Sequence, residues 1–166
     1  MKRNAETETV VHPLEPIFSE RSEILILGSF PSVRSREAAF YYGNPQNRFW
    51  QMRADVFGEP LPADNGARRA LVLDHGLALW DVIASCRIRG SADSAIADVT
   101  PNDLSRVLAF APIRRVLLNG KTAEKYFRKY HADLALPVVT LPSTSPANAA
   151  WSLGNLTDVW RAALLK

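Results

Sequence analysis

The stretch Ile24-Leu-Ile-Leu-Gly-Ser-Phe-Pro-Ser32 sets the architecture expected for this chain. Its apolar first half predicts a strand that is buried on both faces, and its second half predicts a tight, polar turn directly after that strand. In open α/β sheets, ligands bind at the carboxyl ends of the strands. After a short spacer, Tyr41-Tyr-Gly-Asn-Pro-Gln-Asn-Arg-Phe-Trp50 adds aromatic faces and amide groups beside the turn. Together the two stretches predict a pocket that holds one planar heterocycle.

Elsewhere the chain alternates short apolar runs with helical patterns. We expect strands at residues 23–28, 77–83, 115–118 and 138–141. Periodicity, caps and breakers predict helices at 49–56, 67–75, 101–110, 121–131 and 156–164, and a long loop over the polar stretch 85–98. This order predicts an α/β fold, a three-layer α/β/α arrangement around a central, mainly parallel four-stranded sheet. The polar turns that follow the first and fourth strands should then meet in one crevice.

Length and composition favour one domain. The chain has 166 residues with 47% apolar content, which suffices for one well-packed domain and not for two of ordinary size. We expect residues 1–22, with scattered charges and two prolines, to form an N-terminal arm, and residues 23–166 to form a single domain. No run approaches the ~18 apolar residues of a membrane span, and the first residues lack the apolar core of a signal peptide. We therefore expect a cytoplasmic protein without a membrane partner.

The sequence has no pattern typical of a metal or cofactor site. A lone cysteine, Cys86, excludes an internal disulfide and a four-cysteine metal cluster supplied by this chain alone. His12, His75 and His131 show no ligand spacing, and His75 is expected at the end of a helix as a capping or surface group. Signatures of dinucleotide, phosphate-loop, serine-hydrolase and zinc-peptidase sites are absent. We expect neither a metal nor a cofactor.

The charge pattern permits contact with nucleic acid without demonstrating it. The formal net charge is +3, and basic residues come in pairs such as Arg34 with Arg36 and Arg114 with Arg115. Most of these pairs are expected to be solvated surface charge. Serine, threonine and asparagine at the expected strand ends are groups that bind phosphates and base edges, although a Pro-Ser-Thr-Ser-Pro turn is equally common as ordinary loop structure.

Five segments, taken in order, carry a family resemblance. They are Gly28-Ser-Phe-Pro-Ser32, Tyr41-Tyr-Gly-Asn-Pro-Gln-Asn-Arg-Phe-Trp50, Leu79-Trp-Asp-Val-Ile83, Gly90-Ser-Ala-Asp93 and Leu141-Pro-Ser-Thr-Ser-Pro-Ala-Asn148. Together they resemble the uracil-DNA glycosylase superfamily, and within it they are most similar to the hypoxanthine-DNA (DNA-deoxyinosine) glycosylase branch. The resemblance implies that residues 23–166 form a glycosylase-like catalytic domain, whose groove accepts DNA with one nucleotide flipped out of the stack.

The resemblance also implies site residues. Tyr42 matches a position whose ring stacks on the flipped base, with packing under the first turn as the alternative role. Phe30 stands where other branches place an Asp or Asn that positions the attacking water. In the branch resembled here, an asparagine from the following segment takes this role, so the resemblance implies Asn44 as the catalytic residue, with Asn47 as the reserve or as a residue that ties its loop together. Leu141 stands where several branches have a histidine, which favours hypoxanthine over uracil as the substrate.

The remaining expected contacts divide between the base and the phosphates. Gly28 and Phe30 should line the base pocket, and Asn119 is a weaker candidate for reading the base edge, with a turn-capping role equally expected. Hydroxyls of the two turns should bind the phosphates around the flipped nucleotide. These phosphate-binding candidates are Ser29, Ser32, Ser143, Thr144 and Ser145.

The sequence thus predicts a monofunctional DNA glycosylase of base-excision repair. Its expected partner is DNA with a deaminated base, hypoxanthine first and uracil or xanthine as further options, and its expected product is an abasic site. Lys121 is expected at a helix start and not in the pocket, so no amine is placed for Schiff-base chemistry. We expect a monomer, associated with the nucleoid in a prokaryote. The alternatives are a catalytically inactive DNA-binding protein of the same fold, motivated by Phe30 and Leu141, and a nucleoside or nucleotide hydrolase.

Overall fold

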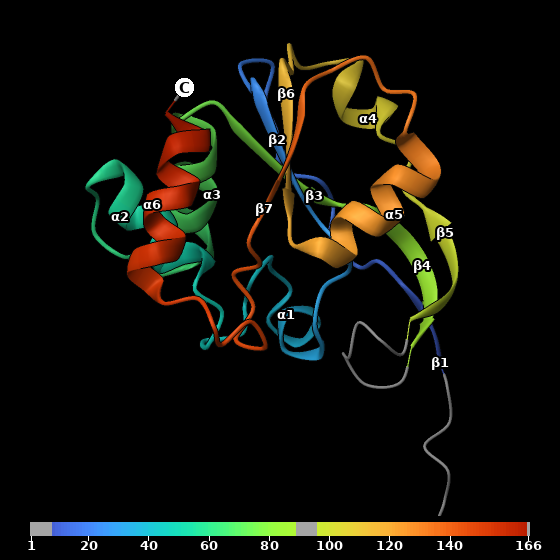
Figure 1. Ribbon diagram of the computed structural model, residues 1–166, viewed down its shortest axis with the longest axis horizontal. Helices are drawn as coiled ribbons and strands as arrows, with labels where there is room; N and C mark the ends of the chain where they lie inside the picture. Colours follow the sequence, from blue (N-terminus) through green and yellow to red (C-terminus); the bar gives the residue numbers. More distant parts are fainter. Residues whose placement is uncertain (1–7, 89–95, 166) are drawn as a thin grey trace, which may run out of the picture.

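The computed structural model describes residues 8–88 and 96–165 and has a parallel four-stranded sheet at its centre (Figure 1). Its strands lie in the order β3-β2-β6-β7, with bounds β2 Ile24–Gly28, β3 Leu77–Asp81, β6 Arg115–Asn119 and β7 Val138–Leu141. Every residue of β2 and β3 is buried, as expected for parallel strands covered on both faces. Gly28 pairs with Asp81 and Asn119 with Leu141, so the strand ends share one edge. The α/β fold predicted from the sequence is confirmed.

Helices cover both faces of this sheet (Figure 1). The helices on one side are α2 (Phe49–Phe57), α3 (Asn65–Asp74) and α6 (Leu153–Leu164), and those on the other are α4 (Ser105–Leu108) and α5 (Lys121–His131). Helix α5 turns an apolar stripe inward, since it buries Ala123, Tyr126 and Phe127 at the i, i+3, i+4 spacing of one helical face. Among the described residues, no helix combines the length and the hydropathy that crossing a bilayer requires.

A second, antiparallel sheet corrects the sequence analysis. In the described part of the chain it has the order β1-β4-β5, formed by β1 (Glu8–Val11), β4 (Ile83–Ile88) and β5 (Ala97–Pro101). The loop predicted over residues 85–98 was therefore wrong where β4 and β5 run. Cys86 and Ile88 point inward while Arg87 is exposed, a period of two that the surrounding polar residues hide. The segment Gly90-Ser-Ala-Asp93 lies outside the described residues.

Two local predictions also change. Thr100 and Pro101 were expected to start a helix, but Thr100 pairs with Ser85 in the second sheet, and α4 begins only at Ser105. This tertiary pairing outweighs a good local capping pattern. The short helix α1 (Val33–Ala38) was not predicted; Ser32 caps it by accepting a hydrogen bond from the Ser35 N–H at 3.1 Å.

The closing helix α6 fixes the turn that follows β7. Trp160 is fully buried, and its indole Nε1 donates a hydrogen bond to the Pro142 carbonyl at 3.0 Å. From α2's cap position, the Arg48 guanidinium donates to the carbonyls of Ser145 and Asn148, each at 3.0 Å, and to that of Trp151. These contacts hold residues 142–151 against the helical layer.

Replacing Trp160 tests this arrangement. Trp160→Ala should lower the free energy of unfolding by about 3–5 kcal/mol, because it leaves a large cavity in a packed core. Trp160→Phe keeps most of the apolar contact and loses the hydrogen bond, so a loss of about 1–2 kcal/mol is expected. Urea unfolding followed by far-ultraviolet circular dichroism measures both. Equal losses for the two variants would contradict this packing role.

Candidate functional site

A pocket lies at the carboxyl edge of the parallel sheet, between the turns that follow β2 and β7. Its cavity measures about 120 Å³, and its residues come from the first turn, from α1 and the segment after it, from the ends of β3 and β6, and from the second turn. They are Gly28, Ser29, Phe30, Pro31, Ser32, Ser35, Tyr41, Tyr42, Asn47, Asp81, Asn119, Ser143, Thr144 and Ser145. The expected convergence of the two polar turns is confirmed. A wider hollow of about 560 Å³ shares Ser143 and Ser145 with this pocket.

Hydrogen bonds around Thr144 join the parts of the pocket. Asn119 Oδ1 accepts the Thr144 N–H at 3.0 Å, and Asn119 Nδ2 donates to the Thr144 hydroxyl at 3.1 Å. That hydroxyl donates in turn to Asn47 Oδ1 at 2.9 Å, which also accepts the Phe49 N–H at 3.0 Å. Thr144 is fully buried, so its hydroxyl serves this network and is not displayed to a phosphate.

Tyr42 forms an aromatic wall. Its ring lines the pocket and stacks on Phe49, with 4.2 Å between ring centroids and 25° between planes, while its backbone takes a φ of 53°. The Tyr42 hydroxyl is buried without a partner of hydrogen-bonding geometry among the described residues. Burial raises the pKa of Tyr42 far above its usual value, and the negative charge of Asp81 adds to the effect. The phenol therefore stays neutral at physiological pH.

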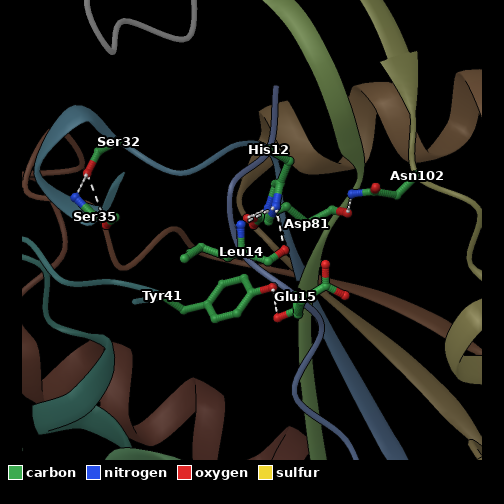
Figure 2. A network of polar contacts seen from close by, with 8 residues as sticks. All are labelled: His12, Leu14, Glu15, Ser32, Ser35, Tyr41, Asp81 and Asn102. Atoms are coloured by element: carbon green, nitrogen blue, oxygen red, sulfur yellow. Dashed lines mark hydrogen bonds and ion pairs between the residues drawn. The ribbon is translucent and has the colours of Figure 1, made fainter. Parts of the chain in front are cut away.

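The floor of the pocket is formed where β2 and β3 end. A Cβ atom on Gly28 would lie 2.4 Å from Asp81 Oδ1 and 3.3 Å from the Tyr42 hydroxyl, so only glycine fits between these side chains. Asp81 is 3% exposed, and its Oδ2 lies 2.7 Å from His12 Nε2, with both side chains buried (Figure 2). Asn102 Nδ2 donates to the Asp81 carbonyl at 2.9 Å.

Sequence reasoning missed this His12–Asp81 pair. The two residues are 69 positions apart, and His12 lies in the segment expected to be an arm. No spacing rule links them. The available signal was the place of Asp81 at the end of an apolar strand beside Gly28, since parallel strand ends meet at one edge of the sheet.

The expected catalytic asparagines are placed differently from one another. Asn47 lines the pocket, whereas Asn44 is half-buried in the neighbouring turn and is not among the lining residues. Asn44 Oδ1 accepts the Gln46 N–H at 3.0 Å. Phe30 lines the pocket, with its ring edge toward His12 at 5.8 Å between centroids. Leu141 is buried at the end of β7 and brings no polar group to the site.

The serines of both turns lie at the rim. Ser29, Ser32, Ser143 and Ser145 all line the pocket and are half-buried. Ser32 caps α1, Ser143 Oγ accepts the Ser145 N–H at 3.1 Å, and Ser145 Oγ accepts the Ala147 N–H at 3.2 Å, so three of these four hydroxyls have local partners. Within residues 8–88 and 96–165, no group of three His, Cys, Asp or Glu side chains is arranged to bind a metal ion.

Comparisons with known proteins agree with this geometry. The family model described as "Uracil DNA glycosylase superfamily" matches residues 15–164. A curated protein named hypoxanthine DNA glycosylase, from Methanosarcina acetivorans, is 36% identical over 148 residues, which are 88% of this chain and 92% of that protein. A protein of the same name from Methanosarcina barkeri is 37% identical over 113 residues, or 67% of this chain and 72% of that protein.

A solved structure is similar as well. It is a solution structure from Methanosarcina acetivorans, described as that of a candidate uracil DNA glycosylase. Its TM-score is 0.77 at 33% sequence identity, and the match covers 91% of this chain and 94% of that one.

Replacing Thr144 tests whether its hydroxyl stabilises the fold. Thr144→Val removes the hydroxyl at almost constant volume and leaves Asn119 Nδ2 and Asn47 Oδ1 each short of one partner. We expect the free energy of unfolding to fall by about 1–3 kcal/mol. Thr144→Ser keeps the hydroxyl and is the matched control. Urea denaturation compares them, and identical midpoints for the valine and serine variants would refute the role of the hydroxyl.

Proposed function

We propose that this chain, which belongs to the uracil DNA glycosylase superfamily, removes hypoxanthine from DNA. As a DNA N-glycosylase, it would leave an abasic site. The observation that carries this proposal is a pocket lined by both turns, with an aromatic wall and uncharged amides at its sides. Relatives named hypoxanthine DNA glycosylases favour hypoxanthine as the base. Uracil and xanthine share part of its hydrogen-bonding edge and are secondary substrates.

The shape of the pocket suits a single extruded nucleotide. The bond between base and sugar is inaccessible inside the DNA stack, so a glycosylase must flip the nucleotide out and hold it. Tyr42 offers one ring face to the base while Phe49 supports the other, and base–aromatic stacking contributes about 1–3 kcal/mol. The base then occupies the pocket, and the sugar stays at its mouth.

Hydrogen-bond capacity separates the two asparagines. An amide oxygen has two lone pairs, and those of Asn47 Oδ1 are taken by Phe49 and Thr144. Asn44 Oδ1 accepts one hydrogen bond, from Gln46, and keeps one lone pair. Water that attacks the sugar must donate a hydrogen to its holder so that its own lone pair faces the anomeric carbon. We therefore assign the water to Asn44, in the turn next to the pocket, and the loop-tying role to Asn47.

An asparagine cannot take a proton at neutral pH, so bond breaking must lead. The bond between C1′ and the base breaks with its electron pair going to the base, which leaves as an anion, and the sugar becomes oxocarbenium-like. Water then forms a bond to C1′ and loses one proton to the solvent or to the departed base. Donors aimed at the departing base lower this barrier, on a scale of about 2.7–4 kcal/mol for one well-placed group. Asn119 keeps one amide hydrogen beyond its bond to Thr144 and lies in the pocket wall, so it is the candidate donor.

The rim serines complete the proposed complex. Ser29, Ser32, Ser143 and Ser145 surround the mouth with hydroxyl and N–H groups, which bind phosphate without adding charge. We propose that the protein acts as a monomer. Water is the only co-reactant that the proposed hydrolysis uses.

An excision assay tests the proposal. Oligonucleotides that carry one hypoxanthine or one uracil are incubated with the protein, and alkali then cleaves any abasic site. We expect the wild-type protein to cleave at hypoxanthine. The Asn44→Ala variant should lose roughly 100-fold in single-turnover rate, because the water is no longer positioned. The control variant Asn65→Ala, at the exposed start of α3, should keep the wild-type rate. DNA binding without any abasic product would instead indicate an inactive binding protein. Faster turnover of free deoxyinosine would indicate a nucleoside hydrolase, and undiminished cleavage by Asn44→Ala would move the water elsewhere.

A further inference from the structure

The Asp81 carboxylate is the charged group at the floor of the pocket, and the proposed hydrolysis gives it no task. One of its oxygens, Oδ2, is held by His12 at 2.7 Å. The other, Oδ1, has no hydrogen-bond partner among the described residues, and Asp81 lines the pocket. A carboxylate oxygen that faces a pocket and is not occupied by the protein's own donors is available to accept a hydrogen bond from a ligand. The position therefore calls for a ligand that donates a hydrogen bond.

His12 fixes the direction in which the carboxylate points. The imidazole is anchored through Nδ1, which lies 2.8 Å from the Leu14 carbonyl, so Nε2 faces Oδ2 of Asp81 (Figure 2). On its other side, Oδ1 lies against Gly28, at the point where any larger residue would place its Cβ. The carboxylate is thus oriented by a buried imidazole and given space by a glycine, which is how binding groups are held in a preorganised site.

The position of Asp81 at the floor of the pocket determines which edge of a flipped base contacts it. A purine is joined to its sugar through N9, and the sugar remains at the mouth of the pocket. The edge farthest from N9 carries N1 and the substituent at C6, so this edge reaches the floor. In hypoxanthine that edge presents an N1–H donor and an O6 acceptor. In adenine the same edge presents an N1 acceptor and an N6 amino donor, in the opposite order.

The floor offers the order that matches hypoxanthine. Asp81 Oδ1 is an acceptor at the end of β3, and the remaining amide hydrogen of Asn119 is a donor at the end of β6, across β2 in the same pocket lining. Asn119 cannot rotate to exchange its oxygen and nitrogen, because Thr144 binds both of them. Adenine would set its N1 lone pair against the carboxylate, which is repulsive. Guanine carries the same N1–H and O6 as hypoxanthine, so this pair does not separate those two bases.

We propose that Asp81, oriented by His12, is a specificity-determining residue that accepts the N1–H of the flipped deaminated purine at Oδ1 and rejects adenine. This inference rests on the proposed glycosylase function and adds a residue to its substrate recognition. Asp81 contacts the base, whereas His12 acts through Asp81 and is a positioning residue.

The test compares two target bases in two proteins. Oligonucleotides carry either hypoxanthine or 1-methylhypoxanthine, which lacks the N1–H donor, and single-turnover rates are measured for wild type and Asp81→Asn. In wild type the methylated base should be released at least roughly tenfold more slowly than hypoxanthine, the scale of one hydrogen bond to a charged group. In Asp81→Asn, hypoxanthine release should slow by roughly 10- to 100-fold, and the ratio between the two bases should shrink by a similar factor.

Controls separate recognition from stability. Glu15→Gln removes the ion pair between Arg106 and Glu15, an exposed contact of the same N-terminal segment, and should leave both rates and their ratio unchanged. His12→Gln should slow both bases and shrink the ratio less than Asp81→Asn does. A purely structural Asp81 would slow both bases equally and keep the ratio.

Each outcome is informative. Equal wild-type rates on the two bases would overturn the role of N1–H even if Asp81→Asn failed to fold, and an unchanged ratio in a folded Asp81→Asn variant would overturn the role of Asp81. Wild-type protein that releases neither base would instead refute the proposed glycosylase function itself.

Discussion

The site depends on one buried side chain, Thr144, whose hydrogen bonds to Asn119 and Asn47 join three separate parts of the chain. Asn119 ends a central strand, Thr144 lies in the turn after the edge strand, and Asn47 lies just before α2. The Arg48 N–H adds a backbone bond to the Thr144 carbonyl at 3.1 Å. Each bond contributes only about 0.5–1.5 kcal/mol, but leaving one unmade in a buried place costs more, so the network favours a single arrangement. A pocket between two turns requires that arrangement before any ligand arrives.

The charges of the site are divided by depth. Half-buried serines of the two turns line the pocket where we propose that DNA phosphates pass, and a carboxylate beside them would repel the phosphates. The negative charge of Asp81 lies instead at the floor, beside His12 and 3% exposed. Its field reaches Tyr42, whose pKa it raises further after burial has already done so, and the neutral phenol keeps the aromatic wall uncharged. Backbone phosphate contact and base recognition can therefore use different groups.

The sequence was informative where the structure depends on local pattern. Apolar runs such as Leu25–Leu27 predicted the parallel strands, and the Gly-Ser-Phe-Pro-Ser turn placed the pocket, because a doubly covered strand must be apolar and its end must be free for ligands. The sequence did not predict the second sheet, because its strands are half polar and pair with strands far away along the chain. The contact between His12 and Asp81 also has no signal in the local sequence pattern. It arises from strand register, which sets Asp81 beside Gly28, and from the path of the segment after β1.

A crystal structure of the Asn44→Ala variant with duplex DNA that carries one hypoxanthine would test the central claim most directly. The account predicts that the purine is flipped out, stacked on Tyr42 between the two turns, with its N1 edge at Asp81 and its sugar at the mouth near residue 44. A hypoxanthine that stays stacked in the helix while DNA crosses another face, or a flipped base whose N1 edge points away from β3, would contradict it.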